Sequence, residues 1–352
     1  MNVDDLLMNS IKCKASDLLI TTGLPAIVRV HGRLKPLNQE YLMPDNTEEI
    51  IKKLTGNKNW DKLNKIGEVD FSYSIQEKYR FRVNAYKQRG TYSAALRLIN
   101  SEIPSFEELR LPNVIKDLAD KNSGLVLVTG PTGSGKSTTL ASMINYINHT
   151  KDRHIITLED PIEYIFSHKK SVIEQREVGL DTLNFANALR ASLREDPDVI
   201  LVGEMRDYET ISIALTAAET GHLVFSTLHT IGAASTVDRI IDVFPSHQQQ
   251  QIRVQIAMTL QGIISQQLLT KQDQLGRVAA FETLVANTAV CNNIREGKSH
   301  QINNIIQTNA KSGMKLMDDS LCDLCKQGLI SREDAFTHSI DVEYMKSVMG
   351  RY

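Results

Sequence analysis

The sequence contains no apolar run that approaches the roughly 20 residues needed for a membrane-spanning helix. Its amino terminus, Met1 to Leu7, is acidic and has no apolar core, so it is not a secretory signal. We therefore expect a cytoplasmic protein without a transmembrane segment, for which peripheral association with a membrane stays open.

An excess of charge of one sign is also missing. The 40 basic and 42 acidic residues give a net charge of −2. A chain with so little net charge gives no reason to expect nucleic acid or an anionic membrane as a direct partner. The sequence thus predicts no nucleic-acid binding.

Cysteine is scarce, with four residues at positions 13, 291, 322 and 325. Cys322 and Cys325 have the C-x-x-C spacing of half a zinc site or of a redox pair. A structural zinc ion needs about four ligands, and no second pair accompanies them. We interpret both as ordinary thiols in a predicted helix over 317–326.

A length of 352 residues suggests about two domains. Residues 1–102 alternate short strand-like and helical runs, which is typical of a small α+β domain. Two prolines indicate a linker over 103–113. Residues 114–270 alternate buried strands with helices, which predicts an α/β nucleotide-binding core. The segment 271–352 is predicted to be mainly helical.

The most specific motif follows the apolar run 125–128, which is expected for a parallel strand buried on both faces. The loop after it matches the pattern G-x-x-x-x-G-K-S, in which backbone N–H groups surround phosphates at the start of a helix. The matching residues are Gly130, Pro131, Thr132, Gly133, Ser134, Gly135, Lys136 and Ser137.

The residue types in this loop predict the roles of three side chains. Lys136 is expected to pair with the β- and γ-phosphates, and the Ser137 hydroxyl to ligate Mg²⁺. Thr138 is expected to contact a phosphate nearer to the sugar. The sequence therefore predicts a Mg²⁺-dependent P-loop NTPase.

Acidic and histidine residues follow three further predicted strands, 155–158, 199–202 and 223–226. The carboxyl ends of parallel strands meet at the edge of the sheet where ligands bind. We therefore expect these side chains to lie near the phosphate loop. They are Glu159, Asp160 and Glu163 after the first strand, Glu204 after the second and His229 after the third.

The length of a strand decides which acidic residue and which histidine can reach the nucleotide. Asp198 and Glu204 lie roughly 20 Å apart at about 3.3 Å per residue, so they cannot share one magnesium ion. Glu204 is at the ligand edge and takes the Walker B role, whereas Asp198 begins the strand. By the same argument, His229 is favoured over His222 as the sensor of the γ-phosphate.

Hydrolysis needs a carboxylate that orients and deprotonates water. Glu204 and Glu163 are the two best-placed carboxylates. The sequence leaves open which is the base and which arranges the water shell of the metal. Glu159 and Asp160 are further candidates near the metal, and the predicted cofactors are a nucleoside triphosphate and Mg²⁺.

The segment Lys78 to Arg97 contains six basic residues and no acidic one. On a strand over 79–84, Arg80 and Arg82 share one face. This pattern fits a plain solvated face. It also fits arginines that reach the nucleotide of a neighbouring subunit, since an arginine supplied in trans stabilises transferring phosphoryl charge.

Several motifs together resemble one family over nearly the whole chain. They are Ser16–Leu19, Gly23–Pro25, Arg29–Gly32, Asp70–Tyr73, Arg80–Asn84, Leu96–Arg97, Thr157–Glu163, Leu201–Asp207 and Gly221–Thr230. These motifs resemble the PilT-type retraction ATPases of type IV pili, within the type II/IV secretion ATPase superfamily. The last three look like its Asp box, its Walker B motif with glutamate and its His box.

The resemblance implies a PAS-like amino-terminal domain and a RecA-like core joined by a mobile linker. Six chains would form a ring with ATP bound between the two domains, and Arg82 and Arg97 would help to complete the site. At the cytoplasmic face of the membrane, the ring would pull on a platform protein at the pilus base. That motion would drive pilin disassembly and twitching motility.

Within the family, extension motors typically carry an extra amino-terminal domain and a tetracysteine zinc site, which this sequence does not show. The segment 289–296 resembles the retraction signature AIRNLIRE but differs at Val290, Cys291 and Asn293. The alternatives are a pilus or secretion assembly ATPase and an accessory retraction paralogue. An alternative from another class is a nucleotide-gated scaffold with little turnover.

Overall fold

The structure is a computed structural model that describes residues 3–30, 32–75, 79–99 and 102–350. His31 and Lys78, which belong to the patterns above, lie outside these residues. The chain divides into two compact units. Unit 1 comprises Met1–Glu102 with Glu163–Ile165, and unit 2 comprises Ile103–Ile162 with Phe166–Tyr352.

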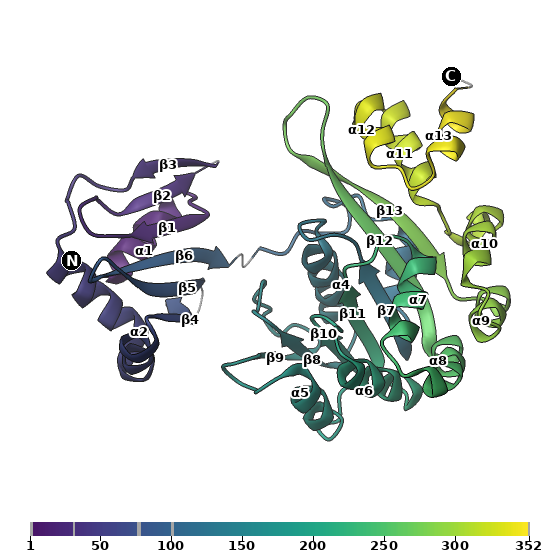
Figure 1. The fold of residues 1–352 in the computed structure, drawn as a ribbon, viewed down its shortest axis with the longest axis horizontal. Coiled ribbons are helices and arrows are strands. Elements are labelled where there is room, and N and C mark those ends of the chain that lie inside the picture. The colour runs from purple at the N-terminus through teal and green to yellow at the C-terminus, as the bar shows by residue number, and fades with distance from the viewer. Residues whose placement is uncertain (1–2, 31, 76–78, 100–101, 351–352) are drawn as a thin grey trace. The chain divides into compact units, whose positions relative to one another are not determined.

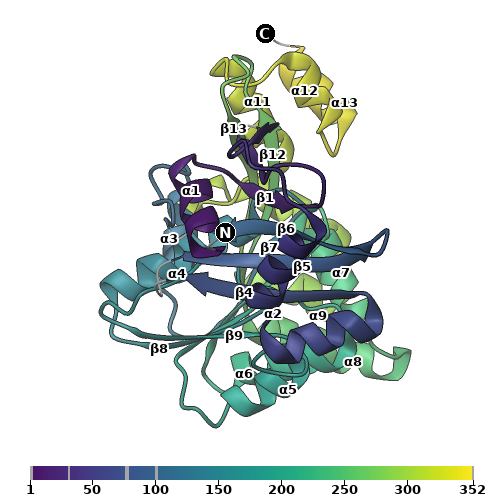
Figure 2. The same ribbon diagram turned by 90° about the vertical axis from the view of Figure 1, so that its left-hand side faces the viewer.

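Unit 1 is a six-stranded antiparallel sheet with two helices on one of its faces (Figures 1 and 2). The strand order is β3-β2-β1-β6-β5-β4. The strands are β1 (Asp17–Ile20), β2 (Ile27–Val30), β3 (Arg33–Pro36), β4 (Glu68–Ile75), β5 (Tyr79–Gln88) and β6 (Thr91–Ile99), and the helices are α1 (Val3–Lys12) and α2 (Pro44–Ile66).

Buried apolar residues alternate with more exposed polar residues along the strands of unit 1, and the buried ones form its core. On β5, Phe81, Val83 and Ala85 are buried, whereas Arg82 between them is exposed. The buried residues join apolar side chains of α1 and α2 in one cluster. Since successive side chains point to opposite faces of a sheet, the other face carries the polar residues. Arg80 and Arg82 therefore share one face of β5, as the sequence predicts.

Unit 2 contains a seven-stranded sheet in the order β13-β12-β7-β11-β10-β8-β9 (Figure 1). β13 is antiparallel to β12, and each of the other neighbouring pairs is parallel. The strands are β7 (Gly124–Thr129), β8 (His154–Glu159), β9 (Val172–Glu177), β10 (Val199–Val202), β11 (Leu223–Leu228), β12 (Leu260–Thr270) and β13 (Arg277–Val285).

The helices of unit 2 fall into a group that precedes β12 in the chain and a group that follows β13. The first group is α3 (Asn113–Ala119), α4 (Lys136–Thr150), α5 (Phe185–Ser192), α6 (Tyr208–Glu219), α7 (Ala233–Asp242) and α8 (Ser246–Thr259). The second group is α9 (Thr288–Arg295), α10 (Ile302–Thr308), α11 (Met317–Lys326), α12 (Arg332–Thr337) and α13 (Val342–Met349).

Helices cover both faces of the central strands. Leu125 and Leu127 of β7 pack in a cluster with residues of α5, α6, α7 and α8. Val126 and Val128 pack on the opposite face with residues of α3 and α4. β7 is therefore buried throughout, which explains its continuous apolar sequence. Among the described helices, none combines the length and the apolar character that crossing a bilayer requires.

The second sheet is wider than the sequence predicts. The four predicted strands correspond to β7, β8, β10 and β11, whereas β9, β12 and β13 were not predicted. Residues 277–285 lie in the segment expected to be mainly helical, yet they form β13, which pairs with β12 from Gly262 to Thr270. The helices α9 to α13 follow this strand.

Candidate nucleotide-binding site

Parallel register brings the predicted site residues of unit 2 to one edge of its sheet. Val202 of β10 is paired with Leu158 of β8 on one side and with Ser226 of β11 on the other. β11 is paired with β7 as far as Thr129, the last residue of β7. Because these strands end together, the residues that follow them share one edge. They are Glu204, His229 and the loop that begins at Gly130, and Glu159, the last residue of β8, lies at the same edge.

The phosphate loop of residues 130–135 has a shape that depends on glycine. Gly130 has a φ of +137°, and a Cβ atom there would lie 2.1 Å from the carbonyl oxygen of Gln266. A side chain at this position would therefore displace the backbone of β12. α4 begins at Lys136 directly after the loop, which puts the positive end of the helix dipole at the place where phosphate binds in such loops.

The side chain of Lys136 is buried within this loop. Its Nζ atom donates hydrogen bonds to the carbonyl oxygens of Gly130 at 2.8 Å and of Pro131 at 3.0 Å. The hydroxyl of Ser134 is also buried, and no described residue hydrogen-bonds to it. Buried hydroxyls without a partner are rare. A phosphate oxygen would provide that partner, so the loop fits a phosphate group.

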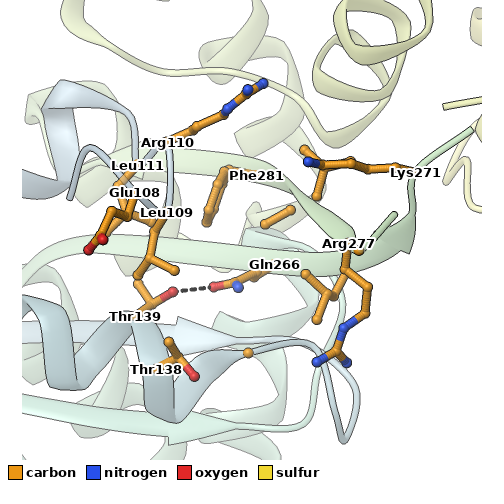
Figure 3. Close-up of a pocket in the computed structure, with 15 residues that line it drawn as sticks. Glu108, Leu109, Arg110, Leu111, Thr138, Thr139, Gln266, Lys271, Arg277 and Phe281 are labelled. Atoms are coloured by element: carbon orange, nitrogen blue, oxygen red, sulfur yellow. Dashed lines mark hydrogen bonds between the residues drawn. The ribbon is translucent and has the colours of Figure 1, made fainter. Parts of the chain in front are cut away.

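A cavity of about 440 Å³ opens beside the loop (Figure 3). Gly135 and Thr138 line it on the side of the loop, and its other walls come from residues 108–111 and from β12 and β13. Apolar side chains such as Leu109 and Phe281 share these walls with Arg277. Small-molecule sites in proteins are commonly about 300–1,000 Å³ and combine apolar side chains with a few polar groups. The cavity therefore fits a nucleoside joined to the phosphates.

Glu204 lies between two further cavities at the same edge. Its Oε2 atom is 3.5 Å from Nε2 of His229, and its Oε1 atom is 2.8 Å from Nε of Arg206. Glu204 and His229 line a cavity of about 310 Å³. Glu204 and Asp160 line another of about 370 Å³. The predicted Walker B glutamate and the histidine after β11 are thus in direct contact.

The other two predicted acidic residues differ in their surroundings. Glu159 is buried, and its Oε1 atom accepts hydrogen bonds from Thr157 at 2.7 Å and from Gln175 at 3.1 Å. Glu163 is exposed in the loop after β8. Mg²⁺ in nucleotide sites is usually held by one or two protein groups, water and phosphate oxygens. The Ser137 hydroxyl and the carboxylates at this edge are oxygen donors of that kind.

Asp198 and His222 occupy the opposite ends of their strands, as expected. Asp198 accepts hydrogen bonds from the His154 amide at 2.8 Å and from Arg153 at 2.9 Å. Burial alone would raise the pKa of Asp198, but these hydrogen bonds and the nearby positive charge hold it below its ordinary value. The ring of His222 lies 2.9 Å from the Ala217 carbonyl oxygen. Both residues stabilise strand starts far from the phosphate loop.

Comparisons with known proteins show the family of this chain and support its fold. A family model described as "Type II/IV secretion system protein" matches residues 2–342. The chain belongs to the type II/IV secretion system protein family. It is 51% identical to a "Twitching motility protein" of Neisseria gonorrhoeae, over 91% of this chain and 85% of the relative.

A second relative is the "Type IV pilus retractation ATPase PilT" of Pseudomonas aeruginosa, which is 48% identical over 95% of this chain and 97% of its own. A solved structure described as the "Pilus Retraction Motor PilT and Bound ADP" matches with a TM-score of 0.93 and 50% identity, over 99% of both chains. The predicted family resemblance and the predicted fold class, a RecA-like core with a smaller PAS-like α+β domain, are therefore confirmed.

Gln266 on β12 is a contact of the phosphate loop that the sequence did not predict. It is almost completely buried. Its Nε2 atom donates to the carbonyl oxygen of Ser134 at 2.7 Å, and its Oε1 atom accepts from Thr139 of α4 at 2.8 Å (Figure 3). Holding the Ser134 carbonyl toward β12 fixes the orientation of the loop backbone. Gln266 is therefore a positioning residue for the loop.

The loop that contains His229 is fastened in a similar way. The Gly232 amide donates to Ser265 Oγ of β12 at 2.9 Å, and the Ala233 amide donates to Glu282 Oε1 of β13 at 2.7 Å. Burial raises the pKa of Glu282, although the hydrogen bonds from Ala233 and from Met317 oppose this change. β12 and β13 thus support both loops of the site from one side.

We predict that Gln266→Ala weakens ATP binding about tenfold, because the loop loses the two hydrogen bonds that hold it in shape, and each is worth about 0.5–1.5 kcal/mol net. Gln266→Glu should weaken binding as well, since a carboxylate cannot donate to the Ser134 carbonyl. The measurement is the dissociation constant of ATP by calorimetry on the purified variants.

The matched control is Gln267→Ala on the same strand. Gln267 is also buried, but it contacts His338, away from the phosphate loop. ATP affinity should stay within about twofold of the unaltered protein in this control. Equal losses of affinity in the two alanine variants would show that Gln266 acts only through general stability.

Proposed function

We propose that this chain is an ATP-hydrolysing motor that powers the retraction of type IV pili. The observation that carries the proposal is the arrangement at one sheet edge, where a phosphate loop with Lys136 lies beside the contact between Glu204 and His229. Similarity to proteins named as retraction ATPases, over almost their full length, supports the assignment to pilus retraction.

In the proposed site, the triphosphate of ATP occupies the loop from Gly130 to Ser137 and the nucleoside occupies the adjoining cavity. Lys136 neutralises charge on the β- and γ-phosphates. Ser137 and, through water, Glu204 would hold Mg²⁺, with Glu159 and Asp160 nearby. The ion would supply further charge neutralisation of the phosphates. Thr138 contacts a phosphate nearer to the sugar.

Glu204 or Glu163 orients and deprotonates the attacking water, and His229 senses the γ-phosphate. The contact between Glu204 and His229 supports this division of roles, since a change at one side chain reaches the other directly. Arg206 holds the second oxygen of Glu204 at 2.8 Å. This ion pair keeps the carboxylate fixed at the edge of the sheet.

The motor proposed here is a ring of six chains at the cytoplasmic face of the membrane. Arg82 and Arg97 of one subunit complete the ATP site of its neighbour, as arginines supplied in trans do in other phosphoryl-transfer enzymes. The exposed side chains of both residues on unit 1 support this role. Motions of the ring would act on a platform protein in the membrane and release pilin subunits.

We predict that Lys136→Ala abolishes ATP turnover, because it deletes the positive charge at the phosphates. Glu204→Gln should preserve ATP binding and slow hydrolysis by about two orders of magnitude or more. Both effects are measured as steady-state phosphate release together with nucleotide affinity.

Asp198→Asn is the matched control for Glu204→Gln, because it makes the same chemical change at the opposite end of β10. Turnover in this control should stay within about twofold of the unaltered protein. Phosphate release that is slow in the unaltered protein and unchanged by Glu204→Gln would instead support a nucleotide-gated scaffold.

The assignment to retraction is tested in cells. Deletion of the gene should leave surface pili that persist and no longer retract, and a plasmid copy should restore retraction unless it carries Lys136→Ala. Pilus number and retraction events are counted by fluorescence microscopy of labelled pili. Cells without surface pili would show that the protein drives pilus assembly.

A further inference from the structure

The open face of the sheet in unit 1 carries a row of charged residues that spans four strands. Arg82 of β5 is directly opposite Arg97 of β6. Arg97 is opposite Asp17 of β1, and Asp17 is opposite Arg29 of β2. Directly opposed residues project from the same face with Cβ atoms about 5 Å apart. The four side chains therefore form one row, which we call the arginine row.

The opposite face of the same strands is apolar. Leu18, Val28, Val83 and Leu96 alternate with the members of the arginine row and lie in the core with α1 and α2. The row therefore lies on the face of the sheet that these two helices leave open. Three arginines and one aspartate give the row a net charge of about +2 at neutral pH.

Asp17 is the centre of the contacts in the row. Its Oδ1 atom accepts a hydrogen bond from Nε of Arg97 at 2.9 Å, and its Oδ2 atom accepts one from the Ser16 hydroxyl at 2.8 Å. Nε of Arg29 lies 3.5 Å from Oδ2. Burial would raise the pKa of Asp17, but these hydrogen bonds and the two arginines lower it below its ordinary value. Asp17 is thus ionised at neutral pH.

The way in which Asp17 holds Arg97 leaves the arginine able to bind an anion. The carboxylate engages only Nε, and no described residue hydrogen-bonds to the two terminal nitrogens of Arg97. The side chain of Arg97 is 72% exposed, whereas that of Asp17 is 16% exposed. A guanidinium anchored through Nε presents its terminal nitrogens to solvent, where they can bind phosphate in a bidentate manner.

Asp17 also permits two arginines to face one another. Like charges directly opposite on neighbouring strands are destabilising, and Arg82 faces Arg97. The carboxylate on the far side of Arg97 supplies a compensating charge. Without it, the Arg97 side chain would swing away from Arg82 at little energetic cost, because its other contacts are with solvent.

We propose that Asp17 is a positioning residue that orients Arg97 beside Arg82, so that the two guanidinium groups bind the terminal phosphate of a nucleotide held by a neighbouring subunit. This inference rests on the proposed function, in which Arg97 acts in trans. Asp17 itself does not touch the nucleotide. It fixes the direction of the side chain that does.

The test is a double-mutant cycle on the assembled full-length protein. Asp17→Asn should lower kcat about three- to fivefold, the range that an exposed ion pair allows, and leave KM for ATP unchanged. Arg97→Ala should lower kcat by about a hundredfold or more. In the Arg97→Ala background, Asp17→Asn should cause no further loss beyond about twofold.

Asp70→Asn is the matched control, because Asp70 is an exposed aspartate on the same face of the sheet that contacts Asn84. Its kcat should equal that of the unaltered protein. Thermal unfolding and sedimentation establish that each variant folds and assembles. If Asp17→Asn does not assemble, Asp17→Glu replaces it. Glutamate keeps the charge but displaces the carboxylate, so kcat should fall about twofold, and only while Arg97 is present.

The outcomes separate this inference from the proposed function. Normal kcat in Arg97→Ala would overturn the trans role of Arg97 and the inference with it. A low kcat in Arg97→Ala with a normal kcat in Asp17→Asn would overturn the inference alone. So would an equal loss from Asp17→Asn in the presence and absence of Arg97, since Asp17 would then act through general stability.

Discussion

The register of four parallel strands is the constraint on which the candidate site depends. β7, β11, β10 and β8 lie side by side and end at one edge of the sheet. That register places the phosphate loop, the Glu204–His229 contact and Glu159 together, although more than 90 residues of chain separate Gly130 from His229. A shift of one strand by a single residue relative to its neighbours would move its side chains to the other face of the sheet and separate these groups.

The loops at this edge depend in turn on β12 and β13. Gln266 holds the phosphate loop, while Ser265 and Glu282 hold the loop that follows His229. The same pair of strands supplies walls of the nucleoside-sized cavity. A movement of these two strands would therefore displace both loops at the same time. In a motor, such shared support joins the state of the nucleotide to the position of the helices that follow β13.

Much of this architecture could be predicted from the sequence, because its signals are local. The apolar runs at β7, β8, β10 and β11 are continuous, and the phosphate loop is defined by adjacent residues. α11 begins and ends where the sequence predicts. β12 was missed because Ser265, Gln266 and Gln267 interrupt its apolar pattern. These polar residues are buried in β12 because their partners come from elsewhere in the chain.

Contacts between distant residues could not be predicted in the same way. The sequence placed Arg82 and Arg97 in a basic segment, but the carboxylate that orients Arg97 lies 80 residues away. Only the pairing of β1 with β6 reveals it. In the proposed motor, the ATP site is complete only when unit 1 of one subunit supplies these arginines to the next subunit.

Coexpression of two inactive variants tests that claim most directly. Rings assembled from equal amounts of Arg97→Ala and Glu204→Gln subunits should recover ATP turnover. Random assembly places an intact Glu204 next to an intact Arg97 of the neighbour at about one interface in four, so about a quarter of normal turnover is expected. Turnover no greater than the sum of the two separate variants, in rings that contain both subunits, would contradict the account.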